Sequence, residues 1–316
     1  MKRLISFDFI RSISIIGIIL CHCCYGISGM SFLGHFLGGT FNVVFLTLSA
    51  FLLGLAWERK QCKSYNIQFL KHRIIKLTYT YYPFLILMFI FLAFTEYDVN
   101  MKDWLMHFLY LPWFNKLPGF GHLWFITLIV LCYITVYLFS KLPYSMLANV
   151  KTGGVILAVV SQFILGLINL PNYICIYLIL YFLAFLYAKK ILEWITNIKT
   201  RQIVIVCCLI LPMIILLYYW ELTNKFTSVW IGIFSAILIF CILNKLFDNA
   251  KENRIISFIS TISFELYLVH HVFCFGEYSL FKIIGNPILG IMAIFLLSVI
   301  LAYPLHFISN KISSKM

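Results

Sequence analysis

Long apolar runs recur along almost the whole 316-residue chain, and they constrain its fold more than any other feature. Hydrophobic residues make up 63% of the sequence and charged residues only 11%, which is more apolar surface than a water-soluble fold can bury. A helix crosses the hydrocarbon core with about 20 predominantly apolar residues, and the chain contains about ten such runs. The sequence therefore predicts an all-α, polytopic membrane protein.

The ten predicted spans cover approximately residues 5–25, 33–56, 74–95, 121–140, 153–169, 172–188, 202–219, 227–243, 256–275 and 287–308. The connections between them are short and polar, and no repeat or low-complexity tract divides the chain. We therefore predict a single membrane domain over residues 1–316. Lys2 and Arg3 precede the first run as they would in a signal peptide, but no small-residue cleavage site follows it, so we expect this run to stay in the protein.

The basic residues are distributed asymmetrically, which explains the formal net charge of +13. Placing the N-terminus in the cytoplasm puts nearly all of the 24 Lys and Arg residues on the cytoplasmic side. Arg11 lies in the cytoplasmic half of the first span, and the opposite face holds only Lys102, Lys116, Lys225 and Lys282. This distribution follows the positive-inside rule. It requires no nucleic-acid partner, and it predicts that both termini are cytoplasmic.

Cysteine and glycine patterns indicate neither a metal site nor a nucleotide loop. Of the ten cysteines, only Cys62 lies in a polar loop, whereas the others lie within the apolar spans and serve there as small packing residues. The sequence has no CxxC metal pattern, since the CxxC spacing of Cys21 and Cys24 lies within an apolar span, and it has no glycine-rich phosphate loop. We therefore expect no metal and no permanently bound cofactor.

The first span carries ionisable residues, which are costly to insert by about 2.5–3.5 kcal/mol each and are therefore functional candidates. In "FDFIRSISIIGIILCHCC", residues 7–24, Asp8 and Arg11 lie near one end and His22 near the other. Eleven residues separate Arg11 from His22, which places them on one helix face about 16.5 Å apart along the axis. Asp8 can pair with Arg11. The alternative is that all three are interfacial residues that contact the head groups.

Further polar residues are predicted at the same non-cytoplasmic level as His22. His122, in "GFGHLWFITLIVLCY" at residues 119–133, begins the fourth span; alternatively, it is an incidental member of an aromatic belt. In "STISFELYLVHHVF", residues 260–273, the spacing of Ser263, Tyr267 and His270 places them on one helix face. Glu265 lies on another face of that helix, as a structural acid or as a proton-linked group.

The cytoplasmic end of the third span is basic. "FLKHRIIKLTYTYYP", residues 69–83, contains Lys71, Arg73 and Lys76. Such a cluster either marks topology by attracting anionic lipid or binds phosphate groups.

Taken in order along the chain, these motifs resemble the membrane acyltransferase family 3, in which polysaccharide and lipid O-acetyltransferases are found. The resemblance rests on Asp8, Arg11 and His22, on "VVFLTLSAFLLG" at 43–54, on "HLWF" at 122–125 and on "ISFELYLVH" at 262–270. The family's Arg-x-Arg pattern reads Lys71-His72-Arg73 here, which places more weight on Arg73, and its Ser-Gly-Phe stretch reads Ser49-Ala50-Phe51. The chain resembles the standalone form, without an extracytoplasmic hydrolase-like domain.

The resemblance implies an enzyme that transfers acyl groups other than amino-acyl groups, most plausibly acetyl. The donor is cytoplasmic acyl-coenzyme A as co-substrate, and the acceptor is a hydroxyl of an extracytoplasmic glycan or lipid-linked saccharide. Arg11 and Arg73, with Lys71, are expected to hold the donor phosphates. The localisation implied is the bacterial cytoplasmic (inner) membrane, with membrane lipid as a further partner.

Within this interpretation His22 is the expected general base, since a neutral imidazole can take the proton of an attacking hydroxyl near pH 7; an acyl-histidine intermediate is the alternative. His122 and His270 are expected to orient the acceptor or to stabilise the oxyanion, with Tyr267, Ser263 and Ser49 in supporting roles. Two other functions remain open from the residues alone. They are a proton-coupled exporter of a glycan, which could use Glu265 and His270, and a structural subunit of polymer biosynthesis.

Overall fold

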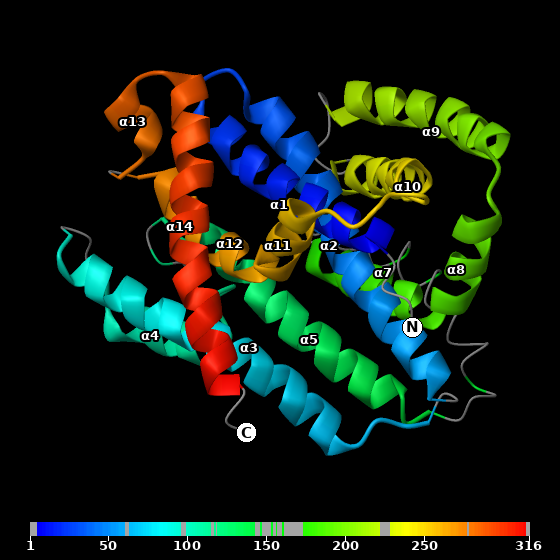
Figure 1. Ribbon diagram of the computed structural model, residues 1–316, viewed down its shortest axis with the longest axis horizontal. Helices are drawn as coiled ribbons and strands as arrows, with labels where there is room; N and C mark the ends of the chain where they lie inside the picture. Colours follow the sequence, from blue (N-terminus) through cyan, green and yellow to red (C-terminus); the bar gives the residue numbers. More distant parts are fainter. Residues whose placement is uncertain are drawn as a thin grey trace. The chain divides into compact units, whose positions relative to one another are not determined.

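The computed structural model describes residues 5–60, 63–95, 99–114, 117, 119–142, 173–221, 228–276 and 278–313, with residues 146, 153, 156 and 160. All regular secondary structure in these residues is helical, as predicted (Figure 1). The helices are α1 (Ile5–Gly26), α2 (Ser31–Arg59), α3 (Ile67–Ala93), α4 (Met101–Phe108), η1 (Gly121–Leu123), α5 (Trp124–Phe139), α7 (Tyr173–Leu186), α8 (Ala188–Asn197), α9 (Thr200–Glu221), α10 (Ser228–Leu246), α11 (Arg254–Thr261), α12 (Ser263–Val269), η2 (His271–Phe273), α13 (Leu280–Ile284) and α14 (Pro287–Ser313).

Five helical stretches among the described residues are long and apolar enough to cross a membrane, namely α1, α2, α3, α14 and the joined η1 and α5. The number rises to seven if the bent pairs α8–α9 and α11–α12 each count as one span, and α7 and α10 are shorter apolar helices. Residues 153–169, which form one predicted span, lie almost entirely outside the described residues. Each of the other nine predicted spans coincides with a helix or a bent pair, while the total of ten stays a prediction.

Polar residues cap the helices that begin in short connections. The Asn66 side chain accepts a hydrogen bond from the Phe69 amide at the start of α3. Asn253 and Asn286 do the same for amides at the starts of α11 and α14. An asparagine is effective here because its side-chain oxygen satisfies one of the amides that have no partner within the helix.

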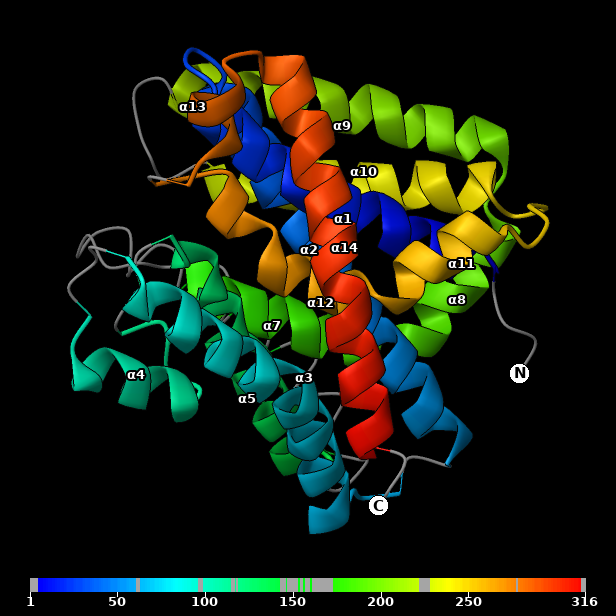
Figure 2. The same ribbon diagram turned by 60° about the vertical axis from the view of Figure 1, so that its left-hand side comes forward.

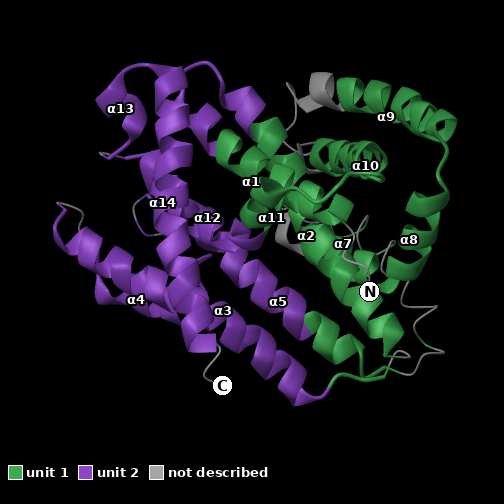
Figure 3. Ribbon diagram, viewed as in Figure 1, with its two compact units in different colours: residues 1–21, 35–65, 135–260 green, residues 22–34, 66–134, 261–316 purple. Residues whose placement is uncertain are grey.

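The chain divides into two compact units, coloured separately in Figure 3. The first comprises Met1–Cys21, His35–Tyr65 and Thr135–Ser260. Within it α9 and α10 lie side by side in both views (Figures 1 and 2). Gly232 of α10 faces the backbone of Gly39 in α2 so closely that an added Cβ would lie 2.8 Å from a Gly39 backbone atom, which is the close approach that small residues permit between membrane helices.

The second unit comprises His22–Gly34, Asn66–Ile134 and Thr261–Met316. Its α14 contacts α3, α12 and α13. A 2.7 Å hydrogen bond joins the Thr80 and Ser309 hydroxyl groups across α3 and α14. The predicted span 256–275 is interrupted in the structure, since α11 ends at Thr261, α12 begins at Ser263, and the 3-10 helix η2 follows His270.

Candidate active site

Four histidine rings meet within the second unit, and we call this group the histidine cluster. His22 lies near the end of α1, His122 is in η1, His270 follows the last residue of α12, and His271 begins η2. The centroid of the His22 ring lies 4.9 Å from that of His270, 4.6 Å from that of His271 and 6.1 Å from that of His122. The structure therefore brings together the three predicted histidines and adds a fourth.

Hydrogen bonds determine which nitrogen of His22 can act as a base. The Nδ1 of His270 lies 3.0 Å from the Leu266 carbonyl oxygen, and because a carbonyl only accepts, this nitrogen carries the proton of the neutral ring. The Nε2 of His270 is therefore an acceptor, and it lies 2.9 Å from His22 Nδ1. His22 Nδ1 must then donate, which places the lone pair of the neutral His22 ring on Nε2.

His122 is held by two contacts with α12. Its Nε2–H donates to the Leu268 carbonyl at 3.2 Å, and the Tyr267 hydroxyl donates to the His122 carbonyl. These contacts leave Nδ1 as the acceptor of a neutral ring, and this atom is buried with no hydrogen-bond partner among the described residues. His122 thus presents a lone pair, and the Tyr267 hydroxyl contacts the backbone of η1.

His271 is the member of the cluster that the sequence interpretation missed. Its Nδ1–H donates to the Gly119 carbonyl at 2.6 Å, and its ring stacks on that of His122 with centroids 4.4 Å apart. Adjacent residues on a continuous helix point in different directions, so both histidines of the doublet cannot share one helix face. The end of α12 at Val269 removes that restriction, because the chain enters η2 at His271.

The loops and helix ends around the cluster explain how these partners arise. The last turn of α12 supplies two carbonyl groups to histidine rings, from Leu268 and from Leu266, which also accepts a hydrogen bond from the His270 amide. Gly119 has a φ of +74°, a conformation that glycine adopts without steric cost. The cluster is therefore held mainly by backbone atoms.

The four rings differ in exposure. His270 is fully buried and His122 and His271 are nearly so, whereas His22 is partly exposed. A molecule approaching the cluster would therefore meet His22 first. With its lone pair on Nε2, His22 is the most exposed ring of the cluster that can accept a proton from a bound hydroxyl.

A second polar contact lies in the first unit, and we call it the Asp8–Ser260–Arg11 contact. The Ser260 hydroxyl donates to Asp8 Oδ1 at 2.9 Å, and Arg11 Nη1 donates to the Ser260 oxygen at 3.5 Å. Ser260 of α11, which the sequence interpretation did not name, thus links Asp8 to Arg11, while their direct pairing stays a prediction. No spacing rule could have found this serine, because Ser260 is 249 residues from Arg11.

The predicted basic residues of α3 have different surroundings. The guanidinium carbon of Arg73 lies 5.7 Å from the centroid of the Phe69 ring and 5.8 Å from that of Tyr133, within the range of a cation–π interaction. The Lys71 side chain is exposed. Arg73 is therefore held in place by aromatic rings, whereas Lys71 is available to solvent or to lipid head groups.

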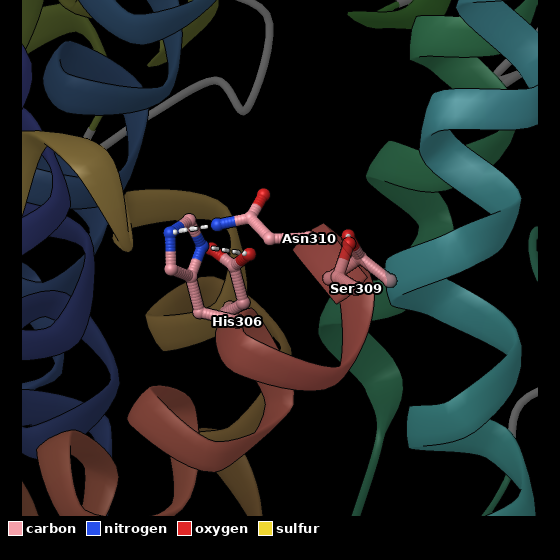
Figure 4. Close-up of polar contacts among 5 residues, drawn as sticks. His306, Ser309 and Asn310 are labelled. Atoms are coloured by element: carbon pink, nitrogen blue, oxygen red, sulfur yellow. Dashed lines mark hydrogen bonds and ion pairs between the residues drawn. The ribbon is translucent and has the colours of Figure 1, made fainter. Parts of the chain in front are cut away.

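Glu265 is the buried end of a polar chain that continues through the partly exposed His306 to the exposed Asn310, both labelled in Figure 4. Its Oε1 lies 2.8 Å from His306 Nδ1, and His306 Nε2 lies 2.7 Å from Asn310 Nδ2 (Figure 4). Because the amide of Asn310 donates to Nε2, the proton of the neutral His306 ring is on Nδ1 and is donated to the carboxylate. This chain ties α12 to α14, which favours a structural role for Glu265.

The remaining predicted site residues are placed as follows. Ser263 is buried at the start of α12, the helix that also carries Tyr267. Ser49 is partly buried on α2 in the first unit. No group of three or more His, Cys, Asp or Glu side chains suited to a metal ion occurs in the part of the chain that the structure describes.

The apolar spans and the cluster of imidazoles define a polytopic membrane protein with a candidate proton-transfer site. A family model described as an acyltransferase domain matches residues 4–307. The chain therefore belongs to the membrane acyltransferase family 3, as the motifs indicated. Neither a curated protein nor a solved structure matches it.

Proposed function

We propose that this protein is an O-acyltransferase of the bacterial cytoplasmic membrane. It moves an acyl group, most simply acetyl, from cytoplasmic acyl-coenzyme A to a hydroxyl of an extracytoplasmic glycan or lipid-linked saccharide. The observation that carries the proposal is the 2.9 Å hydrogen bond between His22 Nδ1 and His270 Nε2. It orients a partly exposed imidazole with its lone pair on Nε2, which is the arrangement that a general base requires.

The proposed reaction needs no group beyond the two substrates and His22. The acceptor hydroxyl gives its proton to His22 Nε2 as its oxygen attacks the thioester carbonyl carbon. A C–O bond forms and the C–S bond breaks, and the departing thiolate takes the proton from His22 to yield free coenzyme A. The ring returns to its starting tautomer, so the same hydrogen bond to His270 serves in each cycle.

The hydrogen bonds of the other histidines support distinct roles. Both nitrogens of His270 are engaged, one with Leu266 and one with His22, so we assign it as a positioning residue. His122 offers a lone pair on Nδ1, which can accept a hydrogen bond from a hydroxyl of the acceptor but cannot stabilise an oxyanion. Orientation of the acceptor is therefore the role that its tautomer supports.

Arg11 of α1 and Arg73 of α3 are the proposed ligands of the donor phosphates, and the exposed Lys71 is a third. A guanidinium suits phosphate because it offers parallel N–H donors. The two aromatic rings beside Arg73 limit the number of conformations that its side chain can adopt. Such ordering before binding lowers the entropy cost of holding the donor.

Incubation of the purified protein with radiolabelled acetyl-coenzyme A and candidate glycans tests the proposal directly. We expect label in the glycan for the parent and for His35→Ala, a control at an exposed histidine of α2. An exporter would move glycan across proteoliposomes without labelling it. A rapid acid quench in the absence of acceptor distinguishes the two mechanisms, since only an acyl-histidine enzyme retains label on the protein.

The membrane topology is open to a separate test. The positive-inside distribution predicts cytoplasmic termini, which places the exposed Asn249 inside and the exposed Lys282 outside. A membrane-impermeant thiol reagent applied to intact cells should label a cysteine introduced at Lys282 but not one at Asn249, in a background without reactive native cysteines. The reverse pattern would place acyl-coenzyme A on the wrong side for this mechanism.

A further inference from the structure

The first unit contains a cavity of about 460 Å³, and none of its lining residues belongs to the histidine cluster. Side chains of α2, α7, α8 and α10 line it, among them Phe51, Ala184, Lys190, Trp194 and Phe240. We call it the α8 cavity. Its volume lies within the range of about 300–1,000 Å³ that is typical of small-ligand sites.

The wall of the α8 cavity is almost entirely apolar. The Thr47 hydroxyl, which is in the lining, donates to the Val43 carbonyl at 2.7 Å and is therefore engaged within α2. Among the described lining residues, Lys190 carries the one charge. A ligand inside this cavity gains binding free energy from burying hydrocarbon. Among the described lining residues, only Lys190 can form an ion pair with a charged group of that ligand.

The helix α8 explains why this charge is at the cavity. Its Lys189, Lys190 and Trp194 side chains are exposed, whereas Ala188 and Ile195 are buried, so the helix has one polar and one apolar face. The pair of helices α8 and α9 is bent by 113° at their junction. An amphipathic helix with lysines and a tryptophan, set at a sharp angle to a span, is typical of the membrane interface.

We propose that the α8 cavity binds one hydrocarbon chain of an anionic membrane phospholipid, whose phosphate contacts the Lys190 ammonium group. The volume has room for about fifteen groups of the size of a water molecule, whose share of liquid volume is about 30 Å³. This capacity suits a single long chain. Lys190 lies with its Nζ 5.9 Å from the centroid of the Tyr187 ring, which holds the ammonium beside the aromatic part of the lining.

The lipid has no part in the acyl transfer itself. It fills space between α2, α7, α8 and α10, and a ligand that binds only the folded state stabilises that state by mass action. The proposal predicts that binding depends on the charge at Lys190 and on the free volume of the cavity. It does not depend on the histidines, so it can fail while the proposed function holds.

Native mass spectrometry of the detergent-purified protein, after addition of phosphatidylglycerol or phosphatidylcholine with identical chains, tests the proposal. The parent should retain one phosphatidylglycerol in at least tenfold preference to phosphatidylcholine. Lys190→Gln should lose this preference, and Lys189→Gln should keep it, because Lys189 is exposed on the same helix but does not line the cavity. Equal retention of both lipids by the parent, or an unchanged preference in Lys190→Gln, overturns the proposal.

A second variant tests the cavity itself. Ile237 lines the cavity and is 44% exposed, so Ile237→Trp can fill space there with little disturbance of the buried core. Retention of either lipid should fall at least fivefold in this variant while its thermal midpoint without added lipid stays within a few degrees of the parent value. Competition by palmitoyl-coenzyme A at equal concentration, with loss of the bound phospholipid, would instead assign the cavity to the acyl donor and overturn the lipid assignment.

Discussion

The two polar groups of the candidate site, one in each unit, are held in different ways. In the histidine cluster, backbone carbonyls of Leu266, Leu268 and Gly119 accept hydrogen bonds from three of the rings. In the Asp8–Ser260–Arg11 contact, both hydrogen bonds join one side chain to another. Backbone atoms of helices and tight turns move little, whereas long side chains change rotamer readily. The cluster therefore resembles a preorganised reaction site, and the arginine contact can rearrange around a ligand.

Loss of the base itself should have the largest effect. His22→Ala should lower the rate of acyl transfer roughly 10²–10⁴-fold, the range associated with a general base, and should leave acyl-coenzyme A binding unchanged. Steady-state kinetics and calorimetric titration of the donor measure the two quantities. His35→Ala is the control. A well-folded His22→Ala protein with parental activity would refute the assignment.

The orientation of the base should matter next. His270→Ala removes the acceptor for His22 Nδ1–H and should lower kcat by about 10²-fold, near the lower end of the range for a general base, because the base remains but both tautomers become accessible. His270→Gln should recover part of this loss, since its side-chain oxygen can accept the same hydrogen bond. Equal activities for the two variants would show that the hydrogen bond does not orient His22.

Changes at the Asp8–Ser260–Arg11 contact should affect the binding of acyl-coenzyme A rather than the rate of acyl transfer. Arg11→Ala removes hydrogen bonds to a charged group, each worth about 1.5–3 kcal/mol, so the KM for acyl-coenzyme A should rise roughly ten- to hundredfold. Arg11→Lys should restore part of it, because an ammonium cannot form two parallel bonds. An effect on kcat alone, with donor affinity intact, would contradict a phosphate-binding role for Arg11. The Asp8–Ser260–Arg11 contact would then not differ in function from the histidine cluster.

The smallest expected effect is on the stability of the second unit at acidic pH, and it arises at a histidine outside the predicted spans. His107 of α4 is fully buried, and burial lowers its pKa, whereas a histidine in an unfolded chain takes up its proton near pH 6.5. The unfolded state then binds more protons below about pH 6.5, so the contribution of His107 to stability is present above that pH and is lost as the pH falls.

Thermal unfolding in detergent from pH 7.5 to 5 measures this effect. The thermal midpoint of the parent should fall as the pH falls, and the midpoint of His107→Gln should fall less. The glutamine side chain can still donate to the Asp103 carbonyl that His107 contacts. His72→Gln, at an exposed histidine of α3, should follow the parent. An equal fall in all three proteins would exclude His107 as the source.

Much of the fold and part of the site could be predicted from local sequence. Apolar runs predicted helices at nine positions where the structure has them, and three of the four clustered histidines were named in advance. The interruption of the ninth predicted span at Ile262 was not predicted, because Thr261 and Ile262 carry no proline or glycine signal. The amphipathic α8 lies between two predicted spans for a similar reason, since its apolar residues do not form a continuous run.

Ser260, His271 and His306 were missed because each acquires its role from a partner distant in sequence. His306 is 41 residues from Glu265, and His271 is 152 residues from Gly119. Neither helix periodicity nor motif spacing predicts contacts between residues so far apart in the sequence. The same holds for the Lys190 side chain, which is an ordinary interfacial lysine until α2 and α10 place apolar walls beside it.

The sequence by itself determined that the chain lies in a membrane, that its elements are helices and that its family is one of acyltransferases. These properties follow from hydropathy and motif order, which are local and can be summed along the chain. Only the tertiary structure decided which nitrogen of His22 carries the lone pair. That choice depends on the contact with His270 Nε2, 248 residues away. The Leu266 carbonyl, four residues before His270, sets the tautomer of that ring, but no local pattern specifies that the His270 ring meets His22.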